Sequence, residues 1–318
     1  MKNSGDPVSA VTRATAFAPG SIGNLGPGLD ILGLAVSGAG DTVVAERAVS
    51  PGLVIAESGH PDLPTDPTRN TVGLAAAAVC RMAGRTDVGV TLRITKGLPL
   101  AGGQGGSAAS AAAGAGAMNA LLGQPLTPQQ VILAALEAES VVAGRHLDNI
   151  APAVLGGLVL IRSTDPLDLV RVPVPEGLHA VLVRPHMQLL TVEGRRALPK
   201  QISLEVALHQ AAQVAAIVAA AWAGDLQLLG RAIDDRIAEP ARSPLLPGFK
   251  AAKAAASGAG ALGCSISGSG PTVFALADGR PAAAAIAEAM VAAYAAVGLE
   301  SDVRIATPDR QGLRLETR

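Results

Sequence analysis

A run of glycines between two regular segments constrains the fold of this chain most strongly. Residues 89–95 alternate apolar and polar side chains and predict a strand, and the alanine-rich residues 107–122 predict a helix. Between them lies a glycine loop, residues 98–106, which reads Leu-Pro-Leu-Ala-Gly-Gly-Gln-Gly-Gly. Glycine has no Cβ, so the backbone N–H groups of such a loop can approach a phosphate closely. The positive end of the following helix points to the same place.

The residues after this loop exclude two common nucleotide motifs. A Walker A loop ends in Gly-Lys-Ser or Gly-Lys-Thr, and neither follows here. A dinucleotide fingerprint has an acidic residue about 20 positions further on, and none stands there. A flexible connection has the same composition, so the loop alone leaves a linker and a phosphate site both open.

Strand and helix patterns mix along the chain without strict alternation, which predicts an α+β fold. A length of 318 residues with 49% apolar residues is enough for two hydrophobic cores. The polar, proline-containing stretch 163–177 is the expected boundary, with one domain over residues 1–168 and a second over 169–318. In the second domain, helices are predicted over residues 202–222 and 226–237, among others.

The composition argues against several partners. The net charge is −1 and the chain has five aromatic residues, so neither a basic surface nor a base-stacking platform for nucleic acid is expected. Cys80 and Cys264 lie far apart in apolar surroundings, which is typical of reduced core residues.

No membrane partner is expected either. Residues 1–10 lack a basic region followed by a long apolar run, so no signal peptide is predicted. The most apolar helical stretch, residues 206–223, is interrupted by His209, Gln210 and Gln213. It therefore predicts a buried helix rather than a membrane span, and the protein is expected to be soluble and cytoplasmic.

Two further segments, 24–30 and 263–272, are also rich in glycine and polar residues. With residues 98–109 they resemble, in order, the three motifs of the GHMP kinases. Residues 146–157, His-Leu-Asp-Asn-Ile-Ala-Pro-Ala-Val-Leu-Gly-Gly, resemble an internal motif of the homoserine kinases within that superfamily, and this match is the most specific. Segments 191–199 and 239–249 are similar to later homoserine kinase segments, so the likeness extends from about residue 15 to about residue 277.

This resemblance implies a fold and a reaction. The N-terminal domain would be like domain 2 of ribosomal protein S5, and the C-terminal domain would be ferredoxin-like. The reaction would be ATP-dependent phosphorylation of the side-chain hydroxyl of L-homoserine, in threonine biosynthesis, with Mg²⁺ bound. The family also implies a homodimer. The implied nucleotide-binding residues are Asn70, Pro99, Leu100, Ala101, Gly102, Gly103, Gln104, Gly105, Gly106 and Ser107.

The same resemblance assigns the reacting end of the site. Ser107 and Glu139 would bind Mg²⁺ and act in catalysis, although Glu137 lies close and spacing alone does not choose between the two glutamates. Asn149 stands where mevalonate kinases are thought to use an aspartate, so it is assigned to the catalytic set without a general base. Homoserine carries an ammonium, a carboxylate and a hydroxyl, which calls for acids and arginines. The implied substrate-binding residues are Asn24, Asp30, His146, Asp148, Arg195, Arg242 and Gly268.

Two positions of the glycine loop depart from the family pattern Gly-Leu-Gly-Ser-Ser-Ala. Gln104 replaces a buried leucine and must find hydrogen-bond partners, and Gly106 replaces a serine. These departures leave open a kinase of a related amino alcohol such as L-threonine, and Gly106 leaves open a nucleotide-binding relative without activity. A kinase of a mevalonate-like acid is a further alternative, although the segment from His146 to Asn149 argues against it because an acid without an amine has no use for Asp148.

Overall fold

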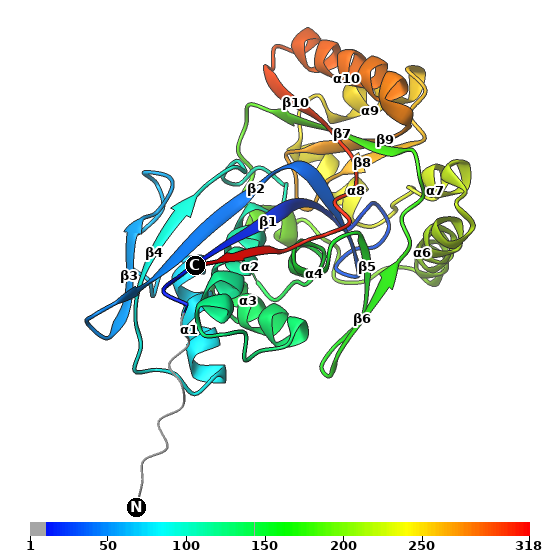
Figure 1. Cartoon of the computed structure of the whole chain (residues 1–318). Helices are drawn as coiled ribbons and strands as arrows, with labels where there is room; N and C mark the ends of the chain where they lie inside the picture. Colours follow the sequence, from blue (N-terminus) through cyan, green and yellow to red (C-terminus); the bar gives the residue numbers. More distant parts are fainter. Residues whose placement is uncertain (1–10, 143) are drawn as a thin grey trace, which may run out of the picture.

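The structure is a computed structural model that describes residues 11–142 and 144–318. Residues 1–10, where no signal peptide is expected, lie outside the described residues. Within the described part, helices and strands form two sheets with helices packed against them, as the α+β prediction required (Figure 1). The two sheets lie next to each other, and their junction positions the site described below.

The first sheet has the strand order β11-β1-β2-β4-β3, with β5 paired to β2 and β6 paired to β5. All its pairs are antiparallel except β3 with β4. Its strands are β1 (Arg13–Gly23), β2 (Leu32–Ala48), β3 (Gly52–Glu57), β4 (Gly89–Thr95), β5 (Leu158–Thr164), β6 (Leu167–Val172) and β11 (Arg314–Thr317).

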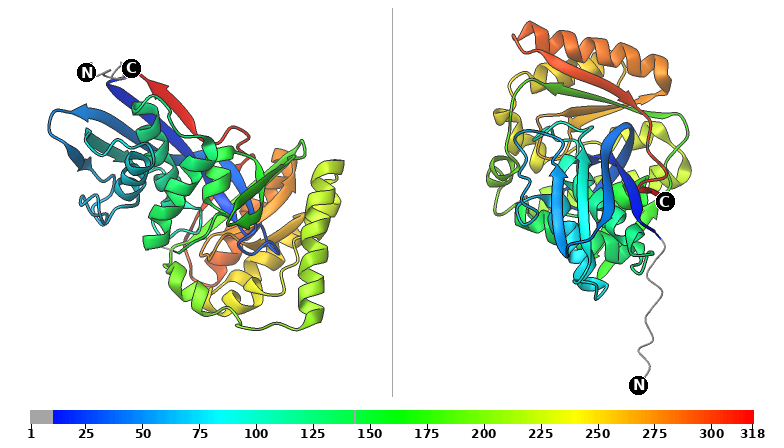
Figure 2. Two further views of the ribbon diagram at one scale, coloured as in Figure 1. Left: turned by 90° about the horizontal axis from the view of Figure 1, so that it is seen from below. Right: turned by 60° about the vertical axis from the view of Figure 1, so that its left-hand side comes forward.

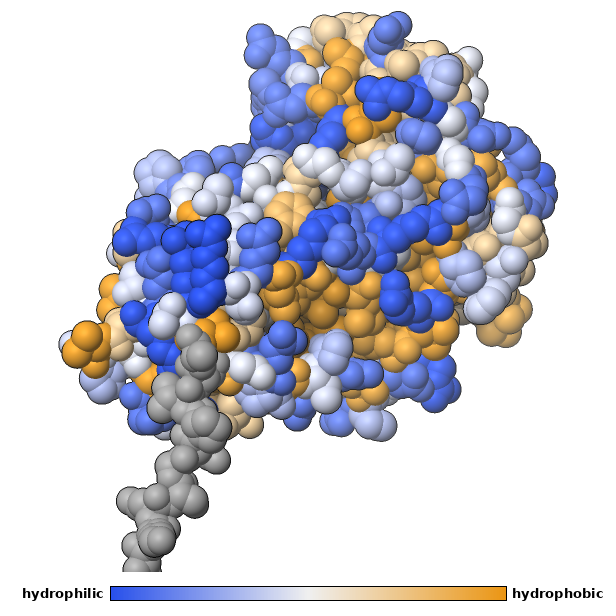
Figure 3. All heavy atoms as spheres, in the orientation of Figure 1, coloured by the Kyte–Doolittle hydropathy of each residue, from blue (hydrophilic) through white to orange (hydrophobic). Residues whose placement is uncertain are grey.

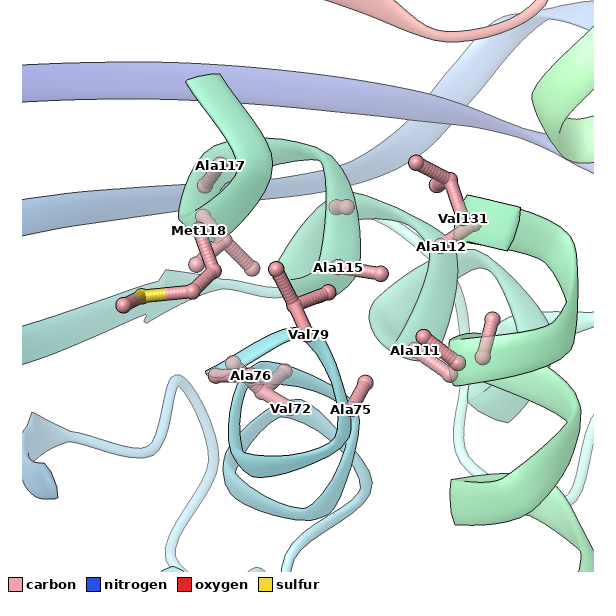
Figure 4. Packing of buried hydrophobic residues seen from close by; sticks show 14 of the residues in the cluster. Val72, Ala75, Ala76, Val79, Ala111, Ala112, Ala115, Ala117, Met118 and Val131 are labelled. Carbon is pink, nitrogen blue, oxygen red and sulfur yellow. The ribbon is translucent and has the colours of Figure 1, made fainter. Parts of the chain in front are cut away.

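Four helices cover one side of this sheet: α1 (Thr71–Met82), α2 (Gly106–Leu121), α3 (Pro128–Val142) and α4 (Ile150–Leu155). The central helix α2 is buried at every position from Ala108 to Leu121, which explains why its sequence shows no polar face. Its small side chains let α1 and α3 approach closely, as Figure 4 shows for Val79 of α1 beside Ala115 and Met118 of α2. This packing fixes the N-terminal end of α2 against the sheet.

The second sheet is antiparallel, with the order β10-β7-β9-β8. Its strands are β7 (Leu178–Pro185), β8 (Gly263–Ile266), β9 (Val273–Asp278) and β10 (Ser301–Ala306). Helices α9 (Phe249–Gly258) and α10 (Gly279–Ala296) pack on one face of it. The remaining helices are α5 (Thr191–Arg196), α6 (Leu204–Ala223), α7 (Leu226–Arg231) and α8 (Ala238–Arg242), followed by a short 3-10 turn, Ser243–Leu245.

The two sheets share a hydrophobic core. Leu32 and Leu34 of β2 belong to the same buried cluster as Leu182 of β7 and Phe274 of β9. Figure 2 shows from two further directions that the two sheets lie against each other. Figure 3 shows apolar surface around α4 and the β5–β6 hairpin. Half-buried leucines there pack against the core that lies between the first sheet and its helices. The loops at the junction of the sheets are therefore held from both sides.

Residue 168, after which the domain boundary is expected, lies inside β6, and β11 returns from the C-terminal end to pair with β1; the boundary itself stays a prediction. Two local expectations differ from the structure. The helix expected over 226–237 ends at Arg231, because the Asp235 carboxylate accepts hydrogen bonds from the N–H groups of Ile237, Ala238 and Glu239 and so starts α8 instead.

The expectation of a buried helix over residues 206–223 is wrong. Only Gln210, Ile217, Ala220 and Ala221 of α6 are buried, and α6 lies at the edge of the molecule (Figure 2). Leu204, Leu208 and Trp222 are 75%, 62% and 67% exposed. Among the described helices, α6 is the one whose length and composition would allow it to cross a membrane. Nine of its 20 residues are alanine, which occurs at both buried and exposed positions of helices.

A stabilising substitution is expected at Tyr294 of α10. Its side chain is fully buried, and its hydroxyl has no hydrogen-bond partner among the described residues, so burial raises its pKa. Removing an unsatisfied buried hydroxyl while keeping the ring should raise the free energy of unfolding by about 1 kcal/mol. We expect this result for Tyr294→Phe in urea unfolding. Tyr294→Leu should instead lower the stability, because the ring packs closely against Gly248. A less stable Tyr294→Phe variant would mean that the hydroxyl is satisfied.

Candidate active site

The three glycine-rich segments of the sequence meet at one cavity of about 350 Å³ between the two sheets. The cavity is lined by the glycine loop, by the turn after β1 and by the turn between β8 and β9. Nearly all the residues expected to form a site line it: Asn24, Asp30, Asn70, Pro99, Leu100, Ala101, Gly102, Gly103, Gly105, Gly106, Ser107, Glu139, His146, Asp148, Asn149, Arg195, Arg242 and Gly268. Gln104 does not line the cavity; its side chain is buried on the far side of the loop.

The glycine loop needs glycine at two positions. Gly103 has φ +71°, and a Cβ there would lie 2.7 Å from the carbonyl oxygen of Gly270. Gly105 also has φ +71°, and its Cβ would lie 2.2 Å from the hydroxyl of Ser21. Gly105 is the N-cap of α2 and offers no side chain to its first turn. The N–H groups of that turn therefore face the cavity without a side-chain cap, an arrangement suited to an anion.

A buried ion pair holds both ends of this loop, and the sequence did not point to it. The ammonium of Lys96 contacts the Asp41 carboxylate, and both side chains are almost completely buried. Asp41 accepts hydrogen bonds from the N–H groups of Gly97 and Leu98 at 3.0 and 3.2 Å, where the loop begins. Lys96 donates to the carbonyl of Gly106 at 3.2 Å, where the loop ends. A charged residue inside an apolar strand pattern was the available signal for Asp41.

Ser107 and Glu139 fit a divalent cation. The Ser107 hydroxyl donates to Glu139 Oε1 at 2.6 Å, while Oε2 is buried without a partner among the described residues. Burial raises the pKa of Glu139, as expected for a carboxylate that needs a cation beside it. No group of three or more metal-binding side chains was found in the described part of the chain. Such a pair of protein oxygens matches Mg²⁺, which takes its other ligands from phosphates and water.

The structure separates the two candidate glutamates. Glu137 forms an exposed ion pair with Arg81, with the two side chains 58% and 52% exposed. Glu139 is 6% exposed and lines the cavity. Two residues along a helix are about 200° apart around its axis, so only one of the pair can face the site.

Asp30, Arg195 and His146 form a charged cluster at the other end of the cavity. Arg195 donates to both carboxylate oxygens of Asp30 at 2.8 and 2.7 Å, and one of its nitrogens lies 2.9 Å from the His146 ring. Burial alone would raise the pKa of Asp30, but the hydrogen bonds with His146 and Arg195 outweigh it and hold that pKa well below its usual value. Asp30 is therefore ionised and already paired with a guanidinium.

Asp148 is the second acid of this end and is less well compensated. Its carboxylate accepts one hydrogen bond, from the backbone N–H of Asn24 at 3.1 Å. Burial, together with the neighbouring charge of Asp30, raises the pKa of Asp148 to about 6. A buried carboxylate that lacks a cationic partner is a ready site for an ammonium group.

Arg242 and Asn149 complete the polar lining. Arg242 is 3% exposed and donates to the carbonyls of Gly194 at 3.0 Å and Gly268 at 2.8 Å. Burial lowers its pKa, and no carboxylate neutralises it directly. Asn149 accepts a hydrogen bond from the Ser21 hydroxyl at 2.9 Å, which fixes its amide beside the glycine loop.

Asn70 lies at the opposite, more apolar end. Its carbonyl oxygen caps α1 by accepting from the N–H of Val72, and its amide donates to the carbonyl of Pro64. The lining of the cavity also includes the apolar side chains of Leu63, Ile94 and Val142. A flat apolar group such as a nucleobase suits this lining better than a charged group.

The chain was compared with known families and structures. Residues 70–157 match the GHMP kinases N terminal domain, and residues 213–296 match the GHMP kinases C terminal domain. The homoserine kinase of Arabidopsis thaliana is 44% identical over 319 residues, covering 98% of this chain and 86% of that protein. The homoserine kinase of Chlorobium phaeovibrioides (strain DSM 265 / 1930) is 43% identical over 316 residues, covering 94% and 98%.

Solved structures of kinases also superimpose on this chain. The homoserine kinase from Cytophaga hutchinsonii ATCC 33406 superimposes with a TM-score of 0.92 at 41% identity, covering 97% of this chain and 98% of that one. A Leishmania major mevalonate kinase in complex with R-mevalonate superimposes with a TM-score of 0.71 at 19% identity, which shows a common fold.

The ion pair under the loop predicts a large loss of stability when one partner is removed. Asp41→Ala leaves the Lys96 ammonium buried without its carboxylate, which should lower the free energy of unfolding by roughly 3–5 kcal/mol. The matched control is Glu137→Ala, which breaks an exposed ion pair and should lower it by about 0–1 kcal/mol. Urea unfolding followed by circular dichroism measures both. Similar losses for the two variants would show that Asp41 and Lys96 do not depend on each other.

Proposed function

This chain belongs to the homoserine kinase family of the GHMP kinases, and we propose that it transfers the γ-phosphoryl group of ATP to the side-chain hydroxyl of L-homoserine. One observation carries the proposal. A single cavity joins an anion-binding loop at one end to two acids and two arginines at the other. A phosphate donor and a zwitterionic acceptor can therefore be bound side by side.

The donor binds at the glycine loop. The N–H groups at the start of α2 and the backbone of Gly103 and Gly105 hold the phosphates, and the apolar end near Asn70 holds the base. Ser107 and Glu139 hold Mg²⁺, which neutralises phosphate charge when bound. Lys96, which is paired with Asp41, holds the end of the loop through the carbonyl of Gly106.

The acceptor binds at the charged end. Its ammonium lies beside Asp148, which forms no ion pair with another described residue, with Asp30 close by. Its carboxylate is recognised by Arg242 and Arg195, of which Arg242 carries the uncompensated charge. Asn24 and His146 contribute hydrogen bonds, and the backbone carbonyl of Gly268 orients Asn24 and Arg242.

No residue is assigned as a general base. Asn149 lies between the two ends, but an amide does not accept a proton usefully near neutral pH. Its role is to hold the glycine loop and the acceptor in line. Phosphoryl transfer is compatible with this, because it depends mainly on positioning and on charge stabilisation.

Three expectations from the sequence stay predictions: a homodimer, a cytoplasmic location and the absence of membrane and nucleic-acid partners. For the described residues, the large exposed side chains of α6 are the surface feature that a partner would most easily cover.

The function is tested by ATP consumption with homoserine, threonine, serine and mevalonate as acceptors. Homoserine should give the highest kcat/KM, and chelation of divalent ions should abolish turnover until Mg²⁺ is restored. A preference for mevalonate would contradict the ammonium site at Asp148. A preference for threonine would support the proposed acceptor site but would replace homoserine as the substrate. Nucleotide binding without any turnover would favour the non-catalytic alternative.

The raised pKa of Asp148 predicts how acceptor binding depends on pH. The carboxylate is ionised above about pH 6 and protonated below it, and only the ionised form attracts an ammonium. The KM for homoserine should therefore fall as the pH rises through about 6, by up to about tenfold for each pH unit below it. Initial rates between pH 5 and 8 measure this.

Two variants separate Asp148 from its neighbours. Asp148→Asn should raise the KM at neutral pH and remove its dependence on pH. Histidine also changes charge in this range, so His146→Gln is the control, and it should keep the pH dependence. If His146→Gln loses the pH dependence of the KM and Asp148→Asn keeps it, the dependence is caused by His146 and not by Asp148.

A further inference from the structure

Gln104 departs from the family pattern of the glycine loop and points away from the cavity. Its side chain is 7% exposed. The amide nitrogen donates to the Thr272 hydroxyl at 3.3 Å, and the amide oxygen accepts from Arg304 at 2.8 Å. Thr272 follows the β8–β9 turn and Arg304 lies on β10, so both partners belong to the second sheet. The side chain of Gln104 therefore forms hydrogen bonds with two separate parts of the second sheet, the turn before β9 and strand β10.

Arg304 depends on this contact. Its guanidinium is largely removed from water, and burial lowers its pKa. Within residues 11–142 and 144–318, its hydrogen-bond partners are two neutral oxygens, the backbone carbonyl of Ser37 and the side chain of Gln104. A buried charge tolerates the loss of a hydrogen-bond acceptor poorly. Gln104 therefore supplies one of the acceptors of the partly exposed Arg304 side chain, and its loss leaves that guanidinium with fewer partners.

The loop backbone touches the second sheet at the same place. The Thr272 hydroxyl donates to the carbonyl of Gly102, and the backbone of Gly103 packs against the carbonyl of Gly270 so closely that no Cβ fits. On its other side, the carbonyl of Gln104 accepts from the N–H of Ser21 on β1 at 3.1 Å. Any movement of the Gln104 side chain is therefore passed directly to Gly102 and Gly103, which line the cavity.

We propose that Gln104, Thr272 and Arg304 form a hydrogen-bond cluster that positions the glycine loop for the nucleotide, with Gln104 and Arg304 as a mutually dependent pair. Gln104 and Arg304 are positioning residues, since neither lines the cavity. The inference rests on the proposed function only in taking a nucleotide as the ligand of the loop. It also explains how this chain tolerates a polar residue where its family usually has leucine.

The pair is tested by a double-mutant cycle on nucleotide binding. Gln104→Leu introduces the usual family residue but leaves Arg304 with one acceptor fewer, and Arg304→Leu leaves the Gln104 oxygen buried without a donor. Each single change should weaken ADP binding, measured by calorimetry with Mg²⁺, by about tenfold. The double variant should bind ADP within about threefold of wild type, because leucine at both positions leaves no unpaired polar group. Gln213→Leu, the same change on α6, is the control and should not alter binding.

Kinetics distinguish positioning of the loop from a general loss of structure. Gln104→Leu should raise the KM for ATP and leave the KM for homoserine within about twofold, because the hydrogen bonds of the described acceptor residues go to groups other than Gln104, Thr272 and Arg304. Equal effects on both KM values, or effects on ADP affinity that simply multiply in the double variant, would overturn the proposal. If the leucine variants fail to fold, a second cycle with Gln104→Met and Arg304→Met replaces them, since methionine fills irregular spaces.

The outcome for the cluster is independent of the outcome for the proposed function. A wild-type protein that binds ADP but does not phosphorylate homoserine would remove the proposed function, while coupling in the ADP affinities would still support the cluster. An active wild-type enzyme with independent effects at the two positions would remove the cluster alone.

Discussion

The site depends on a stretch of backbone that has no room for side chains. At Gly103 the loop lies against the carbonyl of Gly270 in the second sheet, and at Gly105 it lies against the Ser21 hydroxyl in the first. Both residues have positive φ, which other L-residues adopt only with strain. The loop can therefore touch both sheets and still turn its N–H groups toward the cavity. Every other element of the site, from the start of α2 to the acceptor end, is placed relative to this loop.

Some charged side chains of the cavity are paired with each other and others are not. The unpaired ones make the cavity suitable for binding a charged ligand. Asp30 and Arg195 satisfy each other, as Asp41 and Lys96 do under the loop. Asp148 and Arg242 are buried, and the hydrogen-bond partners they have among the described residues are neutral. Burying an uncompensated charge is unfavourable unless a ligand completes it. A zwitterion with one ammonium and one carboxylate can compensate both residues at once, and a neutral alcohol or a simple acid cannot.

The sequence predicted those parts of the site that local rules or family motifs encode. The glycine loop, Ser107, Glu139 and the segment around Asp148 were found because each lies in a short contiguous pattern. Asp41 with Lys96 and Gln104 with Arg304 were not found, because the partners are 55 and 200 residues apart and only the folded sheets bring them together. The exposure of α6 was misjudged for another reason. Its many alanines add to the hydropathy of the helix without requiring burial. Strand β11 was missed because a short, half-exposed segment has little periodicity to recognise.

We assign no general base in the proposed reaction, and the shared core between the sheets supports catalysis by positioning instead. Leu34 of the first sheet and Phe274 of the second lie in one cluster, so the sheets cannot shift independently without exposing apolar surface. The glycine loop is bonded to both, through Ser21 on one side and Thr272 on the other. The distance between the donor and acceptor ends is then set by core packing, which resists small displacements. A misplacement of about 1 Å can slow a reaction about a hundredfold, so rigidity of this kind replaces part of what a base would contribute.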